Sequence, residues 1–292
     1  MFIPYFADKK EVEASLWNEV AFLEKSFVKK ILIFLGILFL AIMLVLPLVS
    51  VLFHAFENGI KVFIKSISNE EALKALQLTL IAAGAAVIAN TVFGIFASFL
   101  ITKFSFRFKK IFSLLIDVPL AVSPVVAGLM LIFAFGKRGW LGPVLDYLGT
   151  KIIFDIPGIL IATIFVTFPL VFREIAPLMQ TQGTEEEEAA AMMGANWFCI
   201  FRKITFPNIK WALFYGSALC ASRALGEFGA VSVISGHLRE KTNTMTLYVE
   251  ILFNEFELAS AFAISSILVM ISLMILILRT IAEYKAKKWE DK

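Results

Sequence analysis

Arg223 and Glu227 carry opposite charges within the mainly apolar stretch ASRALGEFGAVSVISG, residues 221–236. Their i, i+4 spacing places both side chains on one face of a helix. An ionised side chain inside a membrane is costly unless it is paired or hydrated, so such a residue usually has a function. Arg223 can balance the charge of an anion in transit, or Glu227 can neutralise it in an ion pair that only holds helices together. The residues leave both interpretations open.

A second chemically unusual stretch is DVPLAVSPVVAGLM, residues 117–130. Pro119 and Pro124 each remove a backbone hydrogen-bond donor, and Ser123 offers a hydroxyl group between them. Interrupted helices are tolerated at membrane depth where they line a cavity or are buried in protein. The stretch therefore predicts either a broken helix beside a pathway or a proline-kinked helix that only packs.

These side chains do not form a catalytic or metal-binding set. The sequence contains neither a Gly-x-Ser-x-Gly nor a His-x-x-x-His pattern, and Cys199 and Cys220 have no metal-ligand spacing. It also lacks the G-x-x-x-x-G-K-[ST] phosphate-binding loop. Asp117, Arg223 and Glu227 are the acid-base groups left for an intramembrane enzyme, the less favoured alternative. We expect no catalytic residue, metal, cofactor or nucleic-acid site in this chain.

The composition indicates a membrane protein, because 59% of the residues are hydrophobic and only 17% are charged. Soluble domains have about 25% charged residues. Apolar runs of about 20 residues can cross a bilayer as helices. The chain is therefore predicted to be an all-α membrane protein with about six transmembrane helices, near residues 31–53, 75–102, 111–135, 158–173, 211–235 and 259–279. The fourth run can continue past Arg173 as a helix that leaves the membrane.

The basic residues predict the orientation of these helices, because cytoplasmic loops are rich in Lys and Arg. Most of the 27 Lys and Arg residues lie before the first span, at 103–110, at 173–210 and after the last span. We therefore expect a cytoplasmic N-terminal segment 1–30, a transmembrane domain 31–282 with a cytoplasmic loop 174–210, and a cytoplasmic tail 283–292. Both termini are predicted to be cytoplasmic.

The loop contains TEEEEAAAMMG, residues 184–194, which has the signals of a short helix. Thr184 and Glu187 have the spacing of a capping box, in which each side chain bonds to a backbone N–H at the helix start. Gly194 provides the left-handed residue that ends many helices. A helix of about nine residues is unstable alone. It must dock either on another subunit or on the span ends of this chain.

The same loop resembles the EAA loop of ATP-binding-cassette importer permeases. Glu188-Ala189-Ala190 is followed after three residues by Gly194, and nine residues later come Ile204, one residue and Phe206-Pro207. Phe206 stands where the family pattern has Leu. The resemblance implies a type I importer permease (MetI-like) architecture, with a coupling helix seated in a groove of a separate ATPase. It implies that coupling involves Glu187, Glu188, Ala189, Ala190, Gly194, Ile204 and Pro207.

Within that family, the chain resembles the W-type permease subunit of sulfate and thiosulfate importers. The likeness lies in AVSPVVAG, residues 121–128, and in FVTFPLVFREIAPLMQTQGTEEEEAA and RKITFPNIKWALFYG, and it covers most of residues 75–260. Molybdate and tungstate permeases share the coupling loop and a related fifth-span motif. They are the alternative within the transporter class.

This resemblance implies a multi-pass subunit in the plasma membrane of a prokaryote, surrounded by membrane lipids. Its implied partners are a T-type second permease, an ATPase dimer that binds ATP and Mg²⁺, and an extracytoplasmic sulfate-binding protein. The candidate pathway residues are Ser123, Pro124, Ser222, Arg223 and Glu227. A membrane scaffold without a transport role is the other alternative, and it would keep its full function without Arg223 and Glu227.

Overall fold

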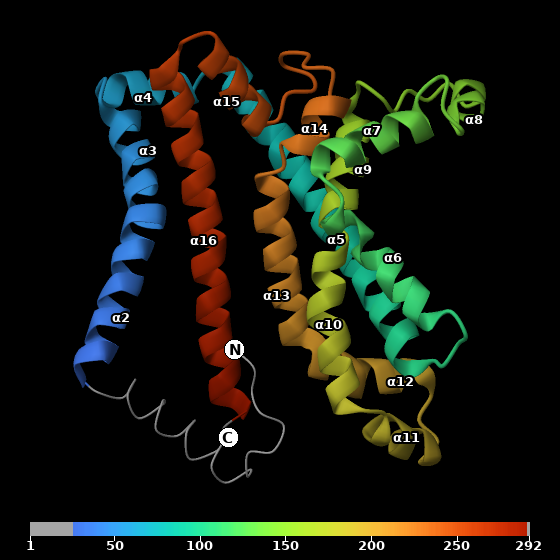
Figure 1. Cartoon of the computed structure of the whole chain (residues 1–292). Coiled ribbons are helices and arrows are strands. Elements are labelled where there is room, and N and C mark those ends of the chain that lie inside the picture. Colours follow the sequence, from blue (N-terminus) through green and yellow to red (C-terminus); the bar gives the residue numbers. More distant parts are fainter. Residues whose placement is uncertain (1–25, 291–292) are drawn as a thin grey trace, which may run out of the picture. The chain divides into compact units, whose positions relative to one another are not determined.

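The computed structural model describes residues 26–290, and within that range every regular element is a helix (Figure 1). Residues 1–25 of the predicted N-terminal segment and the last two residues lie outside the described range. The chain forms two compact units, residues 1–54 and 55–292. The all-α prediction is confirmed for the described residues.

The described part of the N-terminal unit, residues 26–54, forms one long apolar segment. Helix α2 spans Ser26–Leu40, a π-helical turn spans Ala41–Val45, and α3 spans Leu46–Phe56. The turn precedes Pro47, which has no N–H group to donate to it. Residues 28–56 form a 29-residue segment long and apolar enough to cross a bilayer, which includes the predicted span 31–53.

The second unit is built around α5, a 34-residue helix that spans Glu70–Lys103 and follows the short helix α4, Ile60–Ile67. Small residues on one side of α5 allow other helices to approach closely. At Gly94, a Cβ atom would lie only 2.8 Å from a side-chain carbon of Val171 in α10. The predicted span 75–102 lies within α5, which extends beyond it at both ends.

The predicted third span is a broken helix. Helix α6 spans Lys109–Ala121 and α7 spans Pro124–Phe135, and their axes differ by 112°. The break falls at Val122 and Ser123, directly before Pro124. Proline disfavours a helical conformation in the residue before it, which explains the position of the break. A short helix, α8, follows at Gly142–Tyr147.

The fourth span continues past Arg173, as the sequence suggested. Helices α9, Ile156–Thr167, and α10, Pro169–Gln182, together form a 27-residue segment that meets the length and composition of a membrane span. The extension carries the chain directly to the loop with the glutamate run. There α11 spans Glu185–Met192 and α12 spans Trp197–Ile200, and a π-helical turn follows at Phe201–Thr205.

The fifth predicted span, 211–235, is not one continuous helix, because the helix ends at Leu225. Helix α13 spans Phe206–Leu225, and a separate six-residue helix, α14, spans Gly229–Ile234. Helices α15, Met245–Asn254, and α16, Leu258–Glu290, complete the unit. Four segments of the described chain meet the criteria of a membrane span, and the broken pair α6–α7 makes a fifth. The count of six remains a prediction that rests on α13.

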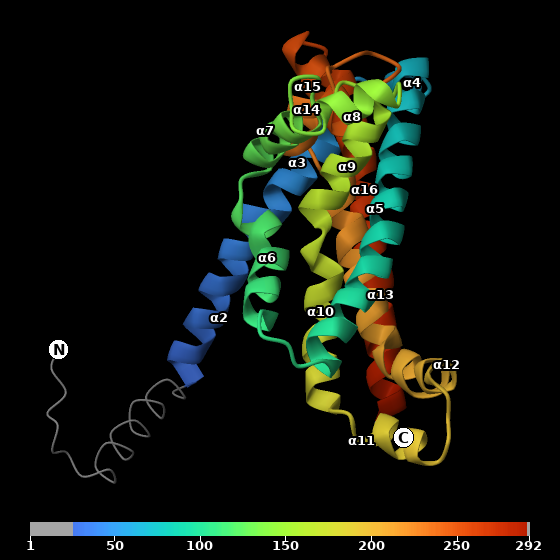
Figure 2. The ribbon, with the colours of Figure 1, turned by 90° about the vertical axis from the view of Figure 1, so that its right-hand side faces the viewer.

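Four buried apolar clusters lie among the described residues of the second unit, and two of them position the segments singled out by the sequence. One joins α7, α9 and α14 through buried residues such as Ala127, Ile159 and Val231. The other joins α5, α10 and α13 through residues such as Ala86 and Ile175. Figures 1 and 2 show α11 and α12 at one end of this unit and α8, α14 and α15 at the other. The predicted coupling loop therefore lies at the opposite end of the unit from α7 and α14 (Figures 1 and 2).

Candidate functional site

Helix α11 begins and ends where the sequence predicted. Thr184 is its N-cap residue, and Gly194 follows its C-terminus with φ +83°. The N–H of Ala195 donates to the carbonyl of Ala190 at 3.1 Å, and that of Gly194 donates to the carbonyl of Ala191 at 2.9 Å. These two bonds form a Schellman motif, which satisfies carbonyls at the helix end.

The predicted capping box is wrong. The Thr184 hydroxyl makes no bond to the backbone of the first turn and donates to the Glu188 carboxylate at 2.6 Å. Glu187 turns toward the spans instead. Its carboxylate accepts a hydrogen bond from the Thr205 hydroxyl at 2.6 Å and lies 2.8 Å from the Lys103 ammonium group. Tertiary partners have replaced the local bond that the pattern suggested.

Lys103 and Glu187 connect the end of α5 to the start of α11. Both side chains are largely shielded from solvent, and Lys103 also donates to the carbonyl of Gly183 at 2.7 Å. Beside them, the Asn208 amide of α13 donates to Glu186 at 3.0 Å. A pair shielded in this way is hard to break without leaving an uncompensated charge. The contacts fix α11 on the ends of α5 and α13.

We expect Lys103→Met to weaken transport by misplacing α11. The substitution removes the cation and leaves the Glu187 carboxylate without its charge partner. We expect substrate uptake to fall about tenfold, equivalent to about 1.4 kcal/mol. The double variant Lys103→Met/Glu187→Gln should recover part of the loss, and Lys110→Met, at an exposed lysine of α6, should have no effect. Equal uptake by Lys103→Met and wild type would contradict this role.

The other coupling residues predicted from the sequence have different surroundings. Glu188 and Ala189 are exposed and Ala190 is buried. Ile204, in the π-helical turn, and Pro207, in the first turn of α13, are half-buried. The predicted residues thus divide into exposed ones, available to a partner, and shielded ones, which hold α11 in place.

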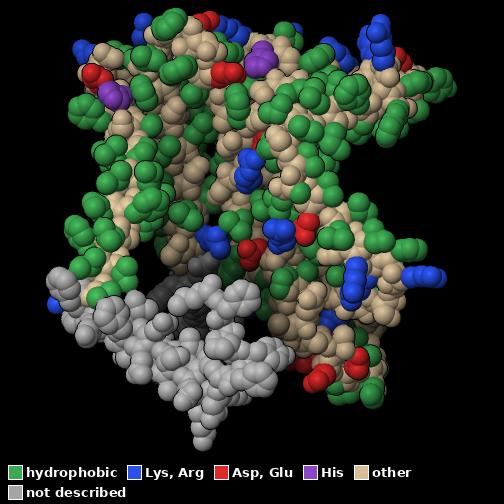
Figure 3. Space-filling view, viewed as in Figure 1, with side chains coloured by type: hydrophobic (Ala, Val, Ile, Leu, Met, Phe, Trp, Pro, Cys, Tyr) green, Lys and Arg blue, Asp and Glu red, His purple; other side chains and the backbone are tan. Residues whose placement is uncertain are grey.

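An exposed apolar face, which the sequence analysis did not identify, lies beside them. We define it by Met192, Met193, Trp197 and Phe198, and Met192 and Met193 are 86% and 83% exposed. Figure 3 shows acidic and hydrophobic side chains together at this end of the unit. Contiguous exposed apolar residues mark interaction sites. The sequence does contain a signal for this face. Two apolar residues precede Gly194, and two more follow Asn196, the N-cap residue of α12.

At the other end of the unit, the structure brings the two broken segments together. Helix α7 packs on α14, and a glycine on each helix allows the close approach. A Cβ atom at Gly229 would lie 2.8 Å from the Cβ of Pro124, and one at Gly128 would lie 2.8 Å from the carbonyl oxygen of Ala230. The motifs that the sequence singled out separately therefore form one structural feature.

Arg223 and Glu227 form an ion pair beside this contact. The Arg223 Nη1 and Glu227 Oε2 atoms are 2.6 Å apart, and Glu227 Oε1 accepts a hydrogen bond from the N–H of Ala230 at 2.9 Å. The Glu227 side chain is 1% exposed, whereas that of Arg223 is 40% exposed. Glu227 is thus a buried anchor for the start of α14, and Arg223 retains an accessible surface.

The serines and Asp117 lie differently. Ser123 is the N-cap residue of α7 and is exposed, and Ser222 is half-buried. Neither serine side chain forms a hydrogen bond within the described part of the chain. Asp117 is paired with Arg173 of α10 at 2.8 Å. That contact joins α6 to α10. Asp117 therefore belongs to a different ion pair from Arg223 and Glu227.

Asn90 is a buried polar residue that the sequence analysis missed, because it stands alone in an apolar stretch of α5. Its amide group donates to the Thr167 hydroxyl at 2.8 Å and to the carbonyl of Ile164 at 3.2 Å. It also lies 3.6 Å from the Cys220 sulfur in α13. The contacts link α5, α9 and α13, so we interpret Asn90 as a packing residue.

Comparison with known proteins shows which family has this architecture. Residues 90–288 match the family described as "Binding-protein-dependent transport system inner membrane component". The chain is 40% identical over 264 residues to the sulfate transport system permease protein CysW of Synechocystis, covering 90% of this chain and 96% of that protein. It is 39% identical over 264 residues to CysW of Escherichia coli, covering 90% and 91%. These identities confirm the resemblance to W-type sulfate permeases.

Two further comparisons extend this result. The chain is 33% identical over 241 residues to the sulfate transport system permease protein CysT of Escherichia coli, covering 82% of this chain and 87% of that protein. Its fold is similar to a chain of a bacterial ABC transporter that imports the acidic polysaccharide alginate, with a TM-score of 0.73 and 14% identity, covering 94% and 99%. The predicted importer-permease architecture is confirmed.

Proposed function

Because the chain belongs to the family of binding-protein-dependent transport system inner membrane components, we propose that it is the permease subunit of an ATP-driven importer of sulfate or thiosulfate. The observation that carries this proposal is the 40% identity to a sulfate permease over 90% of the chain. ATP and Mg²⁺ bind a separate ATPase dimer, and this chain itself is not an enzyme. It lies in a prokaryotic plasma membrane with both termini in the cytoplasm.

In this proposal the ATPase docks on α11 and on the exposed face of Met192, Met193, Trp197 and Phe198. Glu188 and Ala189 are exposed beside that face, and Gly194 ends the helix so that the chain can turn into α12. The shielded residues do not contact the ATPase. They hold α11 on the spans, and they are Glu187, Ile204 and Pro207. Movement of the ATPase thereby passes to α5 and α13 through Lys103 and Thr205.

The anion passes near the broken helices. Arg223 offers an accessible positive charge, and Ser123 and Ser222 offer hydroxyl groups without internal partners among the described residues. In the first turn of α7, Pro124 has no N–H and the N–H of Ala127 donates to the carbonyl of Ser123, which leaves the backbone N–H groups of Val125 and Val126 as donors near Ser123. Helix N-termini attract anions. Pro124 and Glu227 shape this region, since Pro124 starts α7 and Glu227 anchors α14. An oxyanion needs hydrogen-bond donors here more than it needs several cations.

The remaining partners follow from the same proposal. A T-type permease forms the other half of the pathway, and an extracytoplasmic sulfate-binding protein delivers the anion. The similarity of this chain to CysT, itself a sulfate permease protein, supports a pair of related permeases. The ends of α8, α14 and α15 then face the extracytoplasmic side.

Uptake of labelled sulfate tests the substrate. Cells that contain the partner subunits should take up sulfate only when this chain is present, and unlabelled thiosulfate should compete with it. Molybdate should compete weakly. If sulfate uptake does not depend on the chain while molybdate uptake does, the substrate proposal is wrong and the chain is a molybdate permease.

A further inference from the structure

A cavity of about 800 Å³ lies apart from both proposed sites, between the end of α7, the helix α8 and the segment 149–154. A volume of this size is typical of sites for small organic ligands. It lies at the end of the unit opposite α11 and α12 (Figures 1 and 2). The cavity therefore lies at one end of the helical spans.

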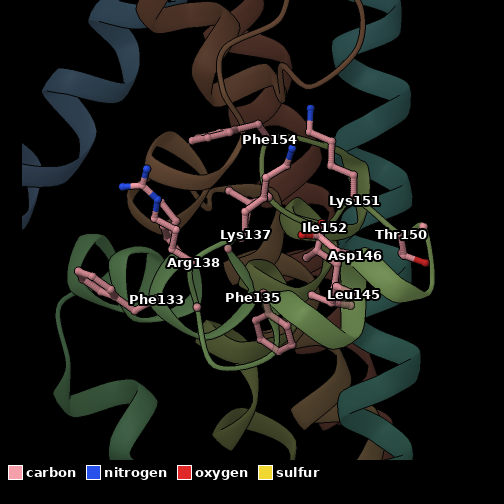
Figure 4. Close-up of a pocket in the computed structure, with 16 residues that line it drawn as sticks. Phe133, Phe135, Lys137, Arg138, Leu145, Asp146, Thr150, Lys151, Ile152 and Phe154 are labelled. Atoms are coloured by element: carbon pink, nitrogen blue, oxygen red, sulfur yellow. The ribbon is translucent and has the colours of Figure 1, made fainter.

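The cavity is lined by more basic than acidic side chains. Lys137, Arg138 and Lys151 line it and are exposed, and Asp146 is the one carboxylate among its lining residues. None of the three basic side chains has an ion-pair partner among the described residues. Figure 4 shows the ammonium groups of Lys137 and Lys151 on the same side of the cavity. An anion would find uncompensated positive charge here.

The walls of the cavity are apolar. Phe133, Phe135, Leu145 and Phe154 contribute to the lining, and Figure 4 places Phe135 and Leu145 away from the two ammonium groups. A small hydrated anion makes no use of such walls, because apolar groups cannot replace its hydration. An anionic amphiphile matches both parts of the cavity.

The outer surface of α8 has the composition of a membrane interface. Trp140 and Tyr147 are 92% and 91% exposed, and Leu141, Val144 and Leu148 are exposed beside them. Val144 and Tyr147 lie in α8 and the other three residues flank it, and we call these five residues the α8 stripe. Trp and Tyr concentrate where hydrocarbon meets lipid headgroups. In Figure 3 the projecting part at the upper right carries hydrophobic side chains on its outer side and basic side chains above them. This order matches acyl chains below and headgroups above.

We propose that this cavity binds the headgroup of an anionic phospholipid, with the acyl chains beside the α8 stripe. Lys137, Arg138 and Lys151 contact the phosphate, and Phe135 and Leu145 contact the glycerol and upper acyl carbons. The proposal requires only that the chain spans a membrane. It is independent of the transported anion.

Lipid quenching of Trp140 fluorescence tests the site in the assembled transporter, reconstituted in nanodiscs. Brominated phosphatidylglycerol and brominated phosphatidylcholine are compared, and the difference between wild type and W140F isolates the Trp140 signal. We expect phosphatidylglycerol to quench preferentially. Each basic residue near an anionic lipid contributes about fivefold in binding, so K137Q/R138Q/K151Q should reduce the preference at least tenfold. The matched control K61Q/K65Q/K241Q, at the same end of the unit, should retain it.

Other outcomes overturn the proposal. Equal quenching by the two lipids, or an equal loss in the control variant, would show that the cavity does not select the headgroup. Displacement of the lipid by soluble glycerol phosphate would identify a simple anion site. Absence of quenching by either lipid would show that a protein partner covers α8. If the triple variant does not assemble, K151Q alone should lower the preference about fivefold, and no change would count against the site.

Discussion

Replacing Met192 and Met193 by glutamate should abolish transport while leaving the permease in the membrane. The two side chains are 86% and 83% exposed, and with Trp197 and Phe198 they form the apolar face on which we propose that the ATPase docks. Burying two carboxylates in that contact without partners is strongly unfavourable. Residues at the centre of an interface each contribute about 2–4 kcal/mol, so ATPase binding should weaken more than 100-fold.

Copurification of the ATPase with the permease measures this effect directly, and sulfate uptake reports its consequence. The matched control is Met192→Leu/Met193→Leu, which keeps the size and apolarity of the face and should bind and transport like wild type. Normal copurification and uptake by the glutamate variant would place the docking surface elsewhere. Loss of the variant from the membrane would instead indicate a folding role for the two methionines.

The start and end of α11 could be predicted because local residues determine them. Thr184 stands at the N-cap position, and Gly194 adopts the positive φ that only glycine adopts without strain. The role of Glu187 could not be predicted in this way. Its partners, Lys103 and Thr205, come from other helices, and the tertiary ion pair replaced the local capping bond.

The broken helices show the same limit. Pro124 and the residue before it indicated a break in the third span, but the 112° bend depends on the packing of α7 against α14. The apolar residues after Gly229 looked like a continuation of the fifth span. The chain leaves the helix after Leu225, where the buried Glu227 carboxylate accepts a hydrogen bond from Ala230 and starts a new helix. Periodicity and hydropathy do not encode such a contact.

The spacing of Arg223 and Glu227 indicated that the two could meet, but it left open which of them the protein needs. The two side chains differ in how far they are buried. Glu227 is almost completely enclosed, and Arg223 is partly accessible. This asymmetry leads to different expectations for the two residues.

Arg223→Ala should be the most damaging single change in the second unit. It leaves the Glu227 carboxylate enclosed without its cation, and breaking a buried pair in this way typically costs about 3–5 kcal/mol. We expect a large fall in the amount of assembled transporter and in its thermal unfolding midpoint. Glu227→Gln should assemble well, because the amide oxygen can still accept from the N–H of Ala230 and the exposed side of Arg223 remains hydrated.

The double variant Arg223→Met/Glu227→Gln separates the structural role of Arg223 from its role in transport. It removes both charges at once and keeps comparable side-chain volume, so assembly should return to near the wild-type level. Sulfate uptake should nevertheless stay below about 10% of wild type, because a guanidinium group has five donor hydrogens and Glu227 cannot use all of them. If the assembled double variant transports normally, Arg223 serves only to neutralise Glu227, and the anion takes its charge compensation from other groups.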